Sequence, residues 1–208
     1  MKTNRFGHLT LIFLLSLSFD VYSQENQIGL EIGYGNTIMN TYNTTKLFLL
    51  DEENSNFYKI GLTYSHSPKY AIFNLKSGIS YDYKKIYESH LNYFRIPIGL
   101  DFQFGNKMQV IFGGGIFTSY LFSYNEISNE YYFEDSKRNF QIGWYGNFGL
   151  GINIYQKYNF SFKYQYNHDL TKLYEEQLTS PGGSPYTLDG KGYDGFLILS
   201  INYILKNK

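Results

Sequence analysis

Residues 92–104 read NYFRIPIGLDFQF, a stretch in which apolar residues alternate with polar or small ones. The apolar set is Phe94, Ile96, Ile98, Leu100, Phe102 and Phe104, and the opposite set is Tyr93, Arg95, Pro97, Gly99, Asp101 and Gln103. Successive side chains of a strand point to opposite faces, so this period of two predicts a β-strand with one apolar and one polar face.

The same alternation recurs along the chain and predicts eight strands, at roughly 27–35, 57–65, 70–83, 92–104, 107–122, 139–154, 157–169 and 193–205. The composition, with 23 Tyr, 18 Phe and 20 Gly, favours a sheet. We therefore expect an all-β fold: a single eight-stranded antiparallel up-and-down transmembrane β-barrel whose apolar face contacts lipid. A soluble barrel of lipocalin type, with the apolar face inside, is the alternative.

Residues 1–23 have the features of a cleaved signal peptide. Lys2 and Arg5 precede an apolar run at 9–19, and a small residue, Ser23, precedes the expected cut at Gln24. Residues 24–208 then form the outer membrane β-barrel domain. The chain has no Cys, which excludes disulfides and thiolate metal sites, and its 18 basic and 18 acidic residues give no basic field for nucleic acid.

The predicted connections alternate in length. Long ones fall at about 36–56, 123–138 and 170–192, with a medium one at 84–91, and short ones at 66–69, 105–106 and 155–156. Membrane barrels have short periplasmic turns and longer extracellular loops, so both termini should be periplasmic and the protein integral to the cell outer membrane. The loops 36–56 and 170–192 form the predicted interaction surface.

Eight strands close to a lumen that side chains can fill. Charges on the inner face must pair, because an isolated buried charge is very costly. We expect the interior to be plugged by a structural charge network of Glu31, Lys59, Lys76, Asp82, Arg95, Asp101 and Lys163. Pro97, which removes a ladder donor, predicts a bulge or a local bend on this inner face.

No catalytic, cofactor or metal site is predicted. The glycine runs 113–115 and 146–151 lack the lysine and helix of nucleotide-binding loops. Ser123, His168 and Asp169 are the one trio that could serve a lipid-modifying barrel enzyme. The acidic stretches at 51–53, 126–135 and 175–176 are typical of solvated loops, and their functional interpretation is binding of divalent cations that bridge lipopolysaccharide.

The run LNYFRIPIGL at 91–100 resembles the Y-x-x-(I/L)-P-(I/L) strand of the PorT-like outer membrane β-barrel family of Bacteroidetes-type bacteria, with Tyr93, Ile96, Pro97 and Ile98 at the motif positions. The following turn and glycine-rich strand, 105–115, and residues 148–151 are also similar. The resemblance implies an eight-stranded outer membrane barrel in a family that is tied in one branch to protein secretion and gliding machinery and has no catalytic motif.

The chain departs from common barrel endings, because residues 204–208 lack a terminal aromatic, which leaves recognition by the barrel assembly machinery to Tyr203 or Leu205. We expect a non-enzymatic protein, structural or accessory to surface assembly or secretion, that acts through its extracellular loops. Its expected partners are outer membrane lipid and lipopolysaccharide, the assembly machinery, and secretion or surface-assembly proteins. A lipid-modifying enzyme and a narrow pore for small solutes are the alternatives.

Overall fold

The computed structural model describes residues 25–43, 48–68, 73–86, 89–125, 139–155, 157–172, 174–179 and 185–206. The predicted signal peptide, 1–23, lies outside the described residues. Within the described ranges, no helix is long and apolar enough to cross a membrane.

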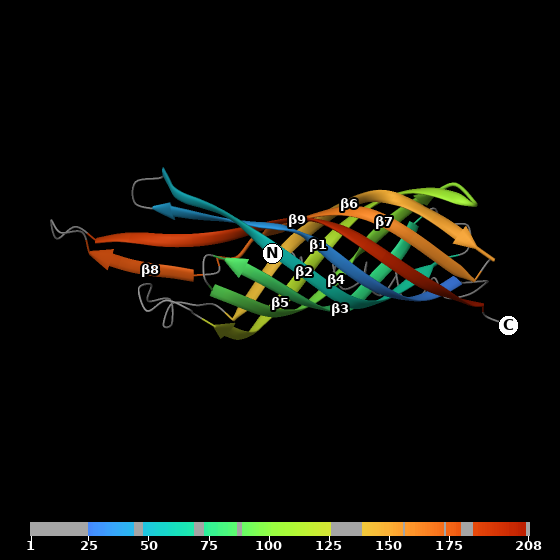
Figure 1. Cartoon of the computed structure of the whole chain (residues 1–208), viewed down its shortest axis with the longest axis horizontal. Helices are drawn as coiled ribbons and strands as arrows, with labels where there is room; N and C mark the ends of the chain where they lie inside the picture. Colours follow the sequence, from blue (N-terminus) through green and yellow to red (C-terminus); the bar gives the residue numbers. More distant parts are fainter. Residues whose placement is uncertain are drawn as a thin grey trace, which may run out of the picture.

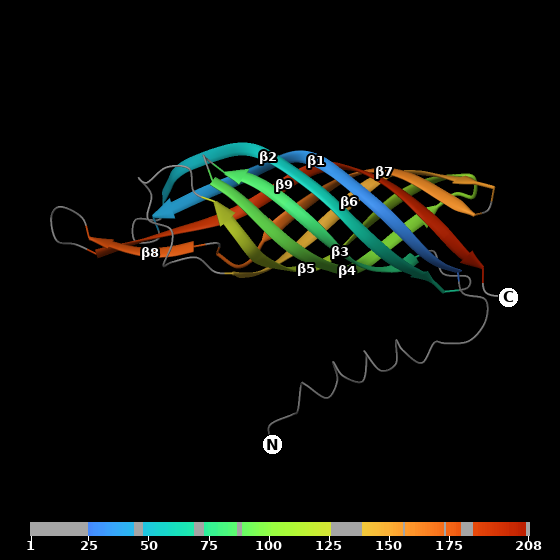
Figure 2. The same cartoon turned by 60° about the horizontal axis from the view of Figure 1, so that its bottom comes forward.

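Strands wind around a closed barrel (Figures 1 and 2). Their bounds are β1 Glu25–Asn43, β2 Phe48–Ser67, β3 Phe73–Ile86, β4 Ser89–Phe104, β5 Met108–Asn125, β6 Phe140–Ile154, β7 Tyr158–Asp169, β8 Tyr174–Thr179 and β9 Pro185–Lys206. Each of β1 to β6 pairs antiparallel with the next strand, β7 pairs with β9, β8 pairs with β9, and β9 pairs with β1. The prediction of a closed eight-stranded antiparallel barrel is confirmed. Glu25 pairs with Lys206, so the first and last strands begin and end at the same end of the barrel.

The short strand β8 continues the course of β7 along β9 after a break. His168 pairs with Tyr193 and Tyr174 pairs with Gly190, so five residues between these pairs, 169–173, correspond to only two on β9, 191–192. In the break, the amides of Leu170 and Thr171 donate to the Ile142 carbonyl on β6, at 2.8 and 3.2 Å. The barrel wall therefore has eight strand positions, and β7 and β8 together occupy one of them with a break between them.

The predicted loops 36–56 and 170–192 are wrong, because most of these residues form strands. β1 and β2 stay paired out to Asn43 and Phe48, and β9 stays paired with β1 as far as Leu188. We call the resulting four-stranded extension, in the order β2–β1–β9–β8, the projecting sheet; it comprises 48–56, 36–43, 185–192 and 174–179. It reaches beyond the barrel at the left of Figure 1. Neighbouring strands satisfy each other's backbone groups there, and this pairing does not require the alternating sequence pattern.

The other connections differ less from expectation. β3 ends at Ile86 and β4 begins at Ser89, so the segment 84–91 is mostly hairpin, whereas 126–138 lies outside the described residues. Gly105 opens the β4–β5 turn with φ of 110°, a conformation that glycine adopts without strain. At the β6–β7 turn, Tyr155 takes φ of 51°.

Pro97 interrupts the β3–β4 ladder without adding a residue. Ser77 pairs with Ile98 and Ser80 with Arg95, so the offset between the two strands is the same on both sides of the gap. Of the two forms predicted at Pro97, the pairing therefore excludes a bulge, and the local bend stays a prediction. The register shift of β4 falls instead between Asn92 and Tyr93, on the side that faces β5.

Candidate functional site

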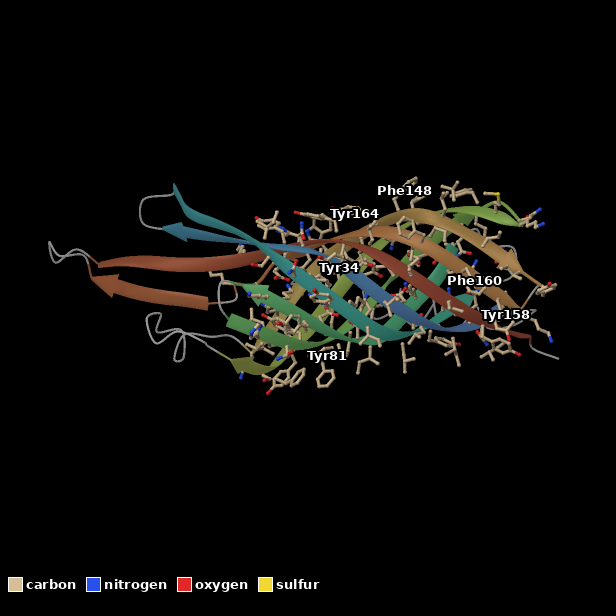
Figure 3. The ribbon with its side chains drawn as sticks, viewed as in Figure 1. Tyr34, Tyr81, Phe148, Tyr158, Phe160 and Tyr164 are labelled. Atoms are coloured by element: carbon tan, nitrogen blue, oxygen red, sulfur yellow. The ribbon has the colours of Figure 1, made fainter. Side chains whose placement is uncertain are left out.

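The outer face of the barrel carries exposed apolar side chains on each of β1 to β7 and on β9. Leu62 is 57% exposed, Ile98 56% and Phe148 61%, although each would be buried in a water-soluble core. Figure 3 shows Tyr81 and Phe148 pointing away from the barrel wall. The apolar residues of the alternating pattern thus point outward, and the lipocalin-type alternative is wrong.

Aromatic and polar side chains mark the two ends of this outer surface. Toward the projecting sheet, the Tyr34 hydroxyl donates to Asn56 at 3.4 Å and the Tyr81 hydroxyl donates to Asn92 at 2.5 Å. At the opposite end, the Tyr64 hydroxyl donates to Asn26 at 3.0 Å. Amphipathic rings with a bonded polar tip are typical of the aromatic girdles that border a membrane.

The lumen holds one charge network around Glu31, which is 2% exposed. Its carboxylate lies 3.4 Å from the Lys59 ammonium and 3.3 Å from that of Lys163, and it also pairs with Lys76. Lys163 lies 3.7 Å from Asp101, which accepts a hydrogen bond from Asn147 at 2.9 Å. Six strands, β1, β2, β3, β4, β6 and β7, therefore contribute to one cluster.

A second network lies on the side of the projecting sheet. Arg95 Nε lies 3.0 Å from Asp82, and Arg95 Nη2 lies 3.3 Å from Asp194. Asp194 also pairs with Lys84 at 2.8 Å and accepts a hydrogen bond from Thr37 at 2.7 Å. Lys84 reaches Asp169 at 3.8 Å.

All seven predicted network residues lie in these two clusters, and the structure adds three more: Lys84, Asp169 and Asp194. The predicted seven carry four positive and three negative charges, so adding one cation and two anions gives five of each. Sequence reasoning missed Lys84 and Asp169 because both lie at strand ends. The parity of Asp194 with Ser200 and Asn202 could have identified it.

Buried aromatic rings link the two networks. Phe57 and Phe196 lie 4.5 Å apart between ring centroids and form a core cluster with Ile198. Lys59 of the first network lies 5.8 Å from the centre of the Phe196 ring, and Lys84 of the second lies 5.7 Å from that of Phe57. Sequence reasoning missed these residues as well, because an apolar side chain on the inner face resembles one on the outer face.

Arg95 also lies over the Phe117 ring, 4.2 Å from its centre. Room for that ring comes from the neighbouring strand, since a Cβ atom on Gly143 would lie 2.7 Å from Phe117 Cε1. Inner-face glycines of this kind make space for large lumen side chains. A small polar cavity remains beside Lys76, Lys163 and Asn202, with about 20 Å³ of room for water-sized molecules, which is enough for about one ordered water.

The family-like motif residues divide between the two faces. Tyr93 is buried in the lumen, with the Lys84 ammonium 5.4 Å from its ring centre, and Pro97 is also buried. Ile96 and Ile98 point outward and are 45% and 56% exposed. The motif therefore places one lumen aromatic and one inward proline between outward apolar residues.

The trio Ser123, His168 and Asp169 is not assembled. His168 faces outward, with its ring 5.7 Å from Trp144 and 4.7 Å from Tyr193, whereas Asp169 is buried in the lumen. Adjacent strand residues point to opposite faces, so the two cannot act on one substrate. The described part of the chain also holds no group of three or more His, Asp or Glu residues that could bind a metal.

No family model and no curated protein sequence matches the chain. Among solved structures, it is similar to the outer membrane protein OprG from Pseudomonas aeruginosa, with a TM-score of 0.50, 10% identity, and coverage of 89% of this chain and 97% of that one. The chain has the fold of this barrel. Neisserial surface protein A also matches, with a TM-score of 0.46, 9% identity, and coverage of 85% and 96%. At these identities the likeness concerns the fold alone.

Proposed function

We propose that the chain is an integral outer membrane β-barrel protein without enzymatic activity, structural or accessory to surface assembly or secretion. The observation that carries the proposal is the combination of an apolar outer face with a charge-paired, filled lumen. Backbone groups in lipid must be satisfied internally, and a closed barrel with an apolar exterior meets that requirement. In this orientation both termini are periplasmic and the projecting sheet lies at the cell surface.

The filled lumen argues against the narrow pore. Phe57, Phe196 and Ile198 are all at most 1% exposed, and the ten paired charges surround them. Separation of His168 from Asp169 argues against the lipid-modifying alternative. Function is therefore carried by the outer surface and the projecting sheet, where lipid, lipopolysaccharide and protein partners can reach the molecule.

The end of β9 and the family resemblance both bear on the partners of the protein. Tyr203 is outward-facing and 44% exposed near the end of β9, where the assembly machinery could recognise it. The likeness to the PorT-like family stays a prediction, and it supports a role beside secretion or surface-assembly proteins.

Deletion in the native host tests the accessory role. We expect the deletion strain to lose a subset of secreted or surface-attached proteins, while other outer membrane barrels stay at normal levels. Complementation with the whole chain should restore them, and complementation with a version in which 39–54 is replaced by a short turn should not. An unchanged surface proteome in the deletion strain would contradict the accessory role.

A further inference from the structure

One edge of the projecting sheet has no partner strand among the described residues. β2 pairs with β3 only from Phe57 toward Ser67, where Phe57 meets Lys84. Its preceding residues, 48–54, pair with β1 alone. We call residues 48–54 the β2 edge. β3, the neighbour of β2 in the barrel, ends at Ile86, only two residues beyond Lys84, and β4 begins at Ser89. The β3–β4 hairpin is therefore too short to pair with residues 48–54.

An unpaired edge presents a row of backbone N–H and C=O groups that can bind a further strand. A register shift between Thr41 and Tyr42 of β1 divides the β2 edge, so its regular part begins at Asp51. Strands rise about 3.3 Å per residue, which puts residues 48–54 roughly 13 to 33 Å along the strand from Tyr58 on the outer aromatic surface. The β2 edge therefore lies well clear of the apolar band.

The sequence of the β2 edge indicates which kind of strand could pair with it. It reads FLLDEEN, with Asp51, Glu52 and Glu53 in succession. Two copies that paired antiparallel through this edge would set acidic residues opposite acidic residues, which is destabilising. β8, the other outer strand of the sheet, contains Glu175 and Glu176, so pairing between β2 of one copy and β8 of another has the same fault.

We propose that the β2 edge binds an extended, basic polypeptide segment of a surface or secreted protein by β-strand addition. Main-chain hydrogen bonds supply the affinity, and the acidic run selects lysine- or arginine-rich segments over a second copy of this chain. The inference rests on the proposed function, because the projecting sheet must lie at the cell surface to meet such a partner.

The test uses the purified full-length protein in lipid nanodiscs and a capped nine-residue peptide of alternating lysine and valine. We expect saturable binding by fluorescence anisotropy and slowed amide exchange centred on residues 51–54. A matched peptide with alternate backbone amides methylated keeps the charge but loses donors, and it should bind about tenfold or more weakly.

Protein variants localise the contact. Asp51→Asn, Glu52→Gln and Glu53→Gln together should weaken peptide binding, whereas Glu175→Gln with Glu176→Gln on β8 should leave it unchanged; heat-modifiable migration on gels confirms that each variant folds. Equal binding of the methylated peptide would show that charge alone acts and would overturn the proposal. Absence of binding, or exchange protection on β8 instead of β2, would also overturn it. Because the assay uses purified protein, its failure leaves the role tested by gene deletion unaffected.

Discussion

Replacing Glu31 with glutamine is expected to lower the free energy of unfolding by about 3–5 kcal/mol, the usual cost of removing one partner from a buried ion pair. Glu31 is 2% exposed and pairs with Lys59, Lys76 and Lys163. Without its carboxylate, Lys76 and Lys163 keep Asp101 as an ion-pair partner, at 4.0 and 3.7 Å, whereas Lys59 keeps no ion-pair partner among the described residues. The change is measured by urea titration of the protein in detergent or vesicles. Unboiled samples are run on a gel, and the fraction in the fast-migrating, folded band is followed against urea concentration.

A double variant provides the control. Lys59 has Glu31 as its ion-pair partner at 3.4 Å, so Glu31→Gln with Lys59→Met removes one charge of each sign. We expect this double variant to recover much of the lost stability, because residues in one network couple strongly. A Glu31→Gln protein within about 0.5 kcal/mol of the parent, the range of ordinary surface substitutions, would contradict a desolvated, charge-paired lumen.

Replacing Ile98 with arginine is expected to destabilise the barrel by about 2–4 kcal/mol, the cost of a cation on the lipid face at the bilayer midplane. Ile98 is 56% exposed, and it lies near the middle of the outward apolar row of β4. In water, the same change at such an exposed site would be close to neutral. Unfolding in vesicles, followed by the heat-modifiable band, measures the difference.

Phe104→Arg is the matched variant on the same strand and the same face. Phe104 is 44% exposed and directly precedes the turn at Gly105, so its cost should fall to about 0–1 kcal/mol, as expected near an interface. Equal effects of Ile98→Arg and Phe104→Arg would contradict the placement of the apolar band across a membrane.

The fold could be predicted from the sequence because one physical constraint acts on nearly every strand residue. A barrel wall between lipid and a polar lumen forces period-two alternation, and residues such as Ile98 and Arg95 show their faces by parity alone. The projecting sheet escapes this constraint. Residues 36–43 and 48–54 pair as strands although no alternating pattern marks them, so the parity of the sequence predicts a loop there.

The lumen could be predicted only in part, for the same reason. Parity identified charged residues on the inner face, but it could not distinguish Phe57 or Phe196 from outward apolar residues, because their neighbours are known only from the pairing of distant strands. It also could not show which charges meet. Arg95 and Asp194 are 99 positions apart in the sequence and lie 3.3 Å apart in the barrel.

Trp144 permits the most direct test of the claim that the apolar face contacts lipid, because it is the single tryptophan of the chain. Its ring is 42% exposed on the outer face, 5.7 Å from Tyr166, in the aromatic surface toward the projecting sheet. The measurement is tryptophan fluorescence in bilayers of lipids brominated at different depths. We predict strong quenching that is greater for bromines near the headgroup than for bromines near the bilayer centre. Fluorescence that brominated lipids leave unchanged and that water-soluble acrylamide quenches would contradict the account.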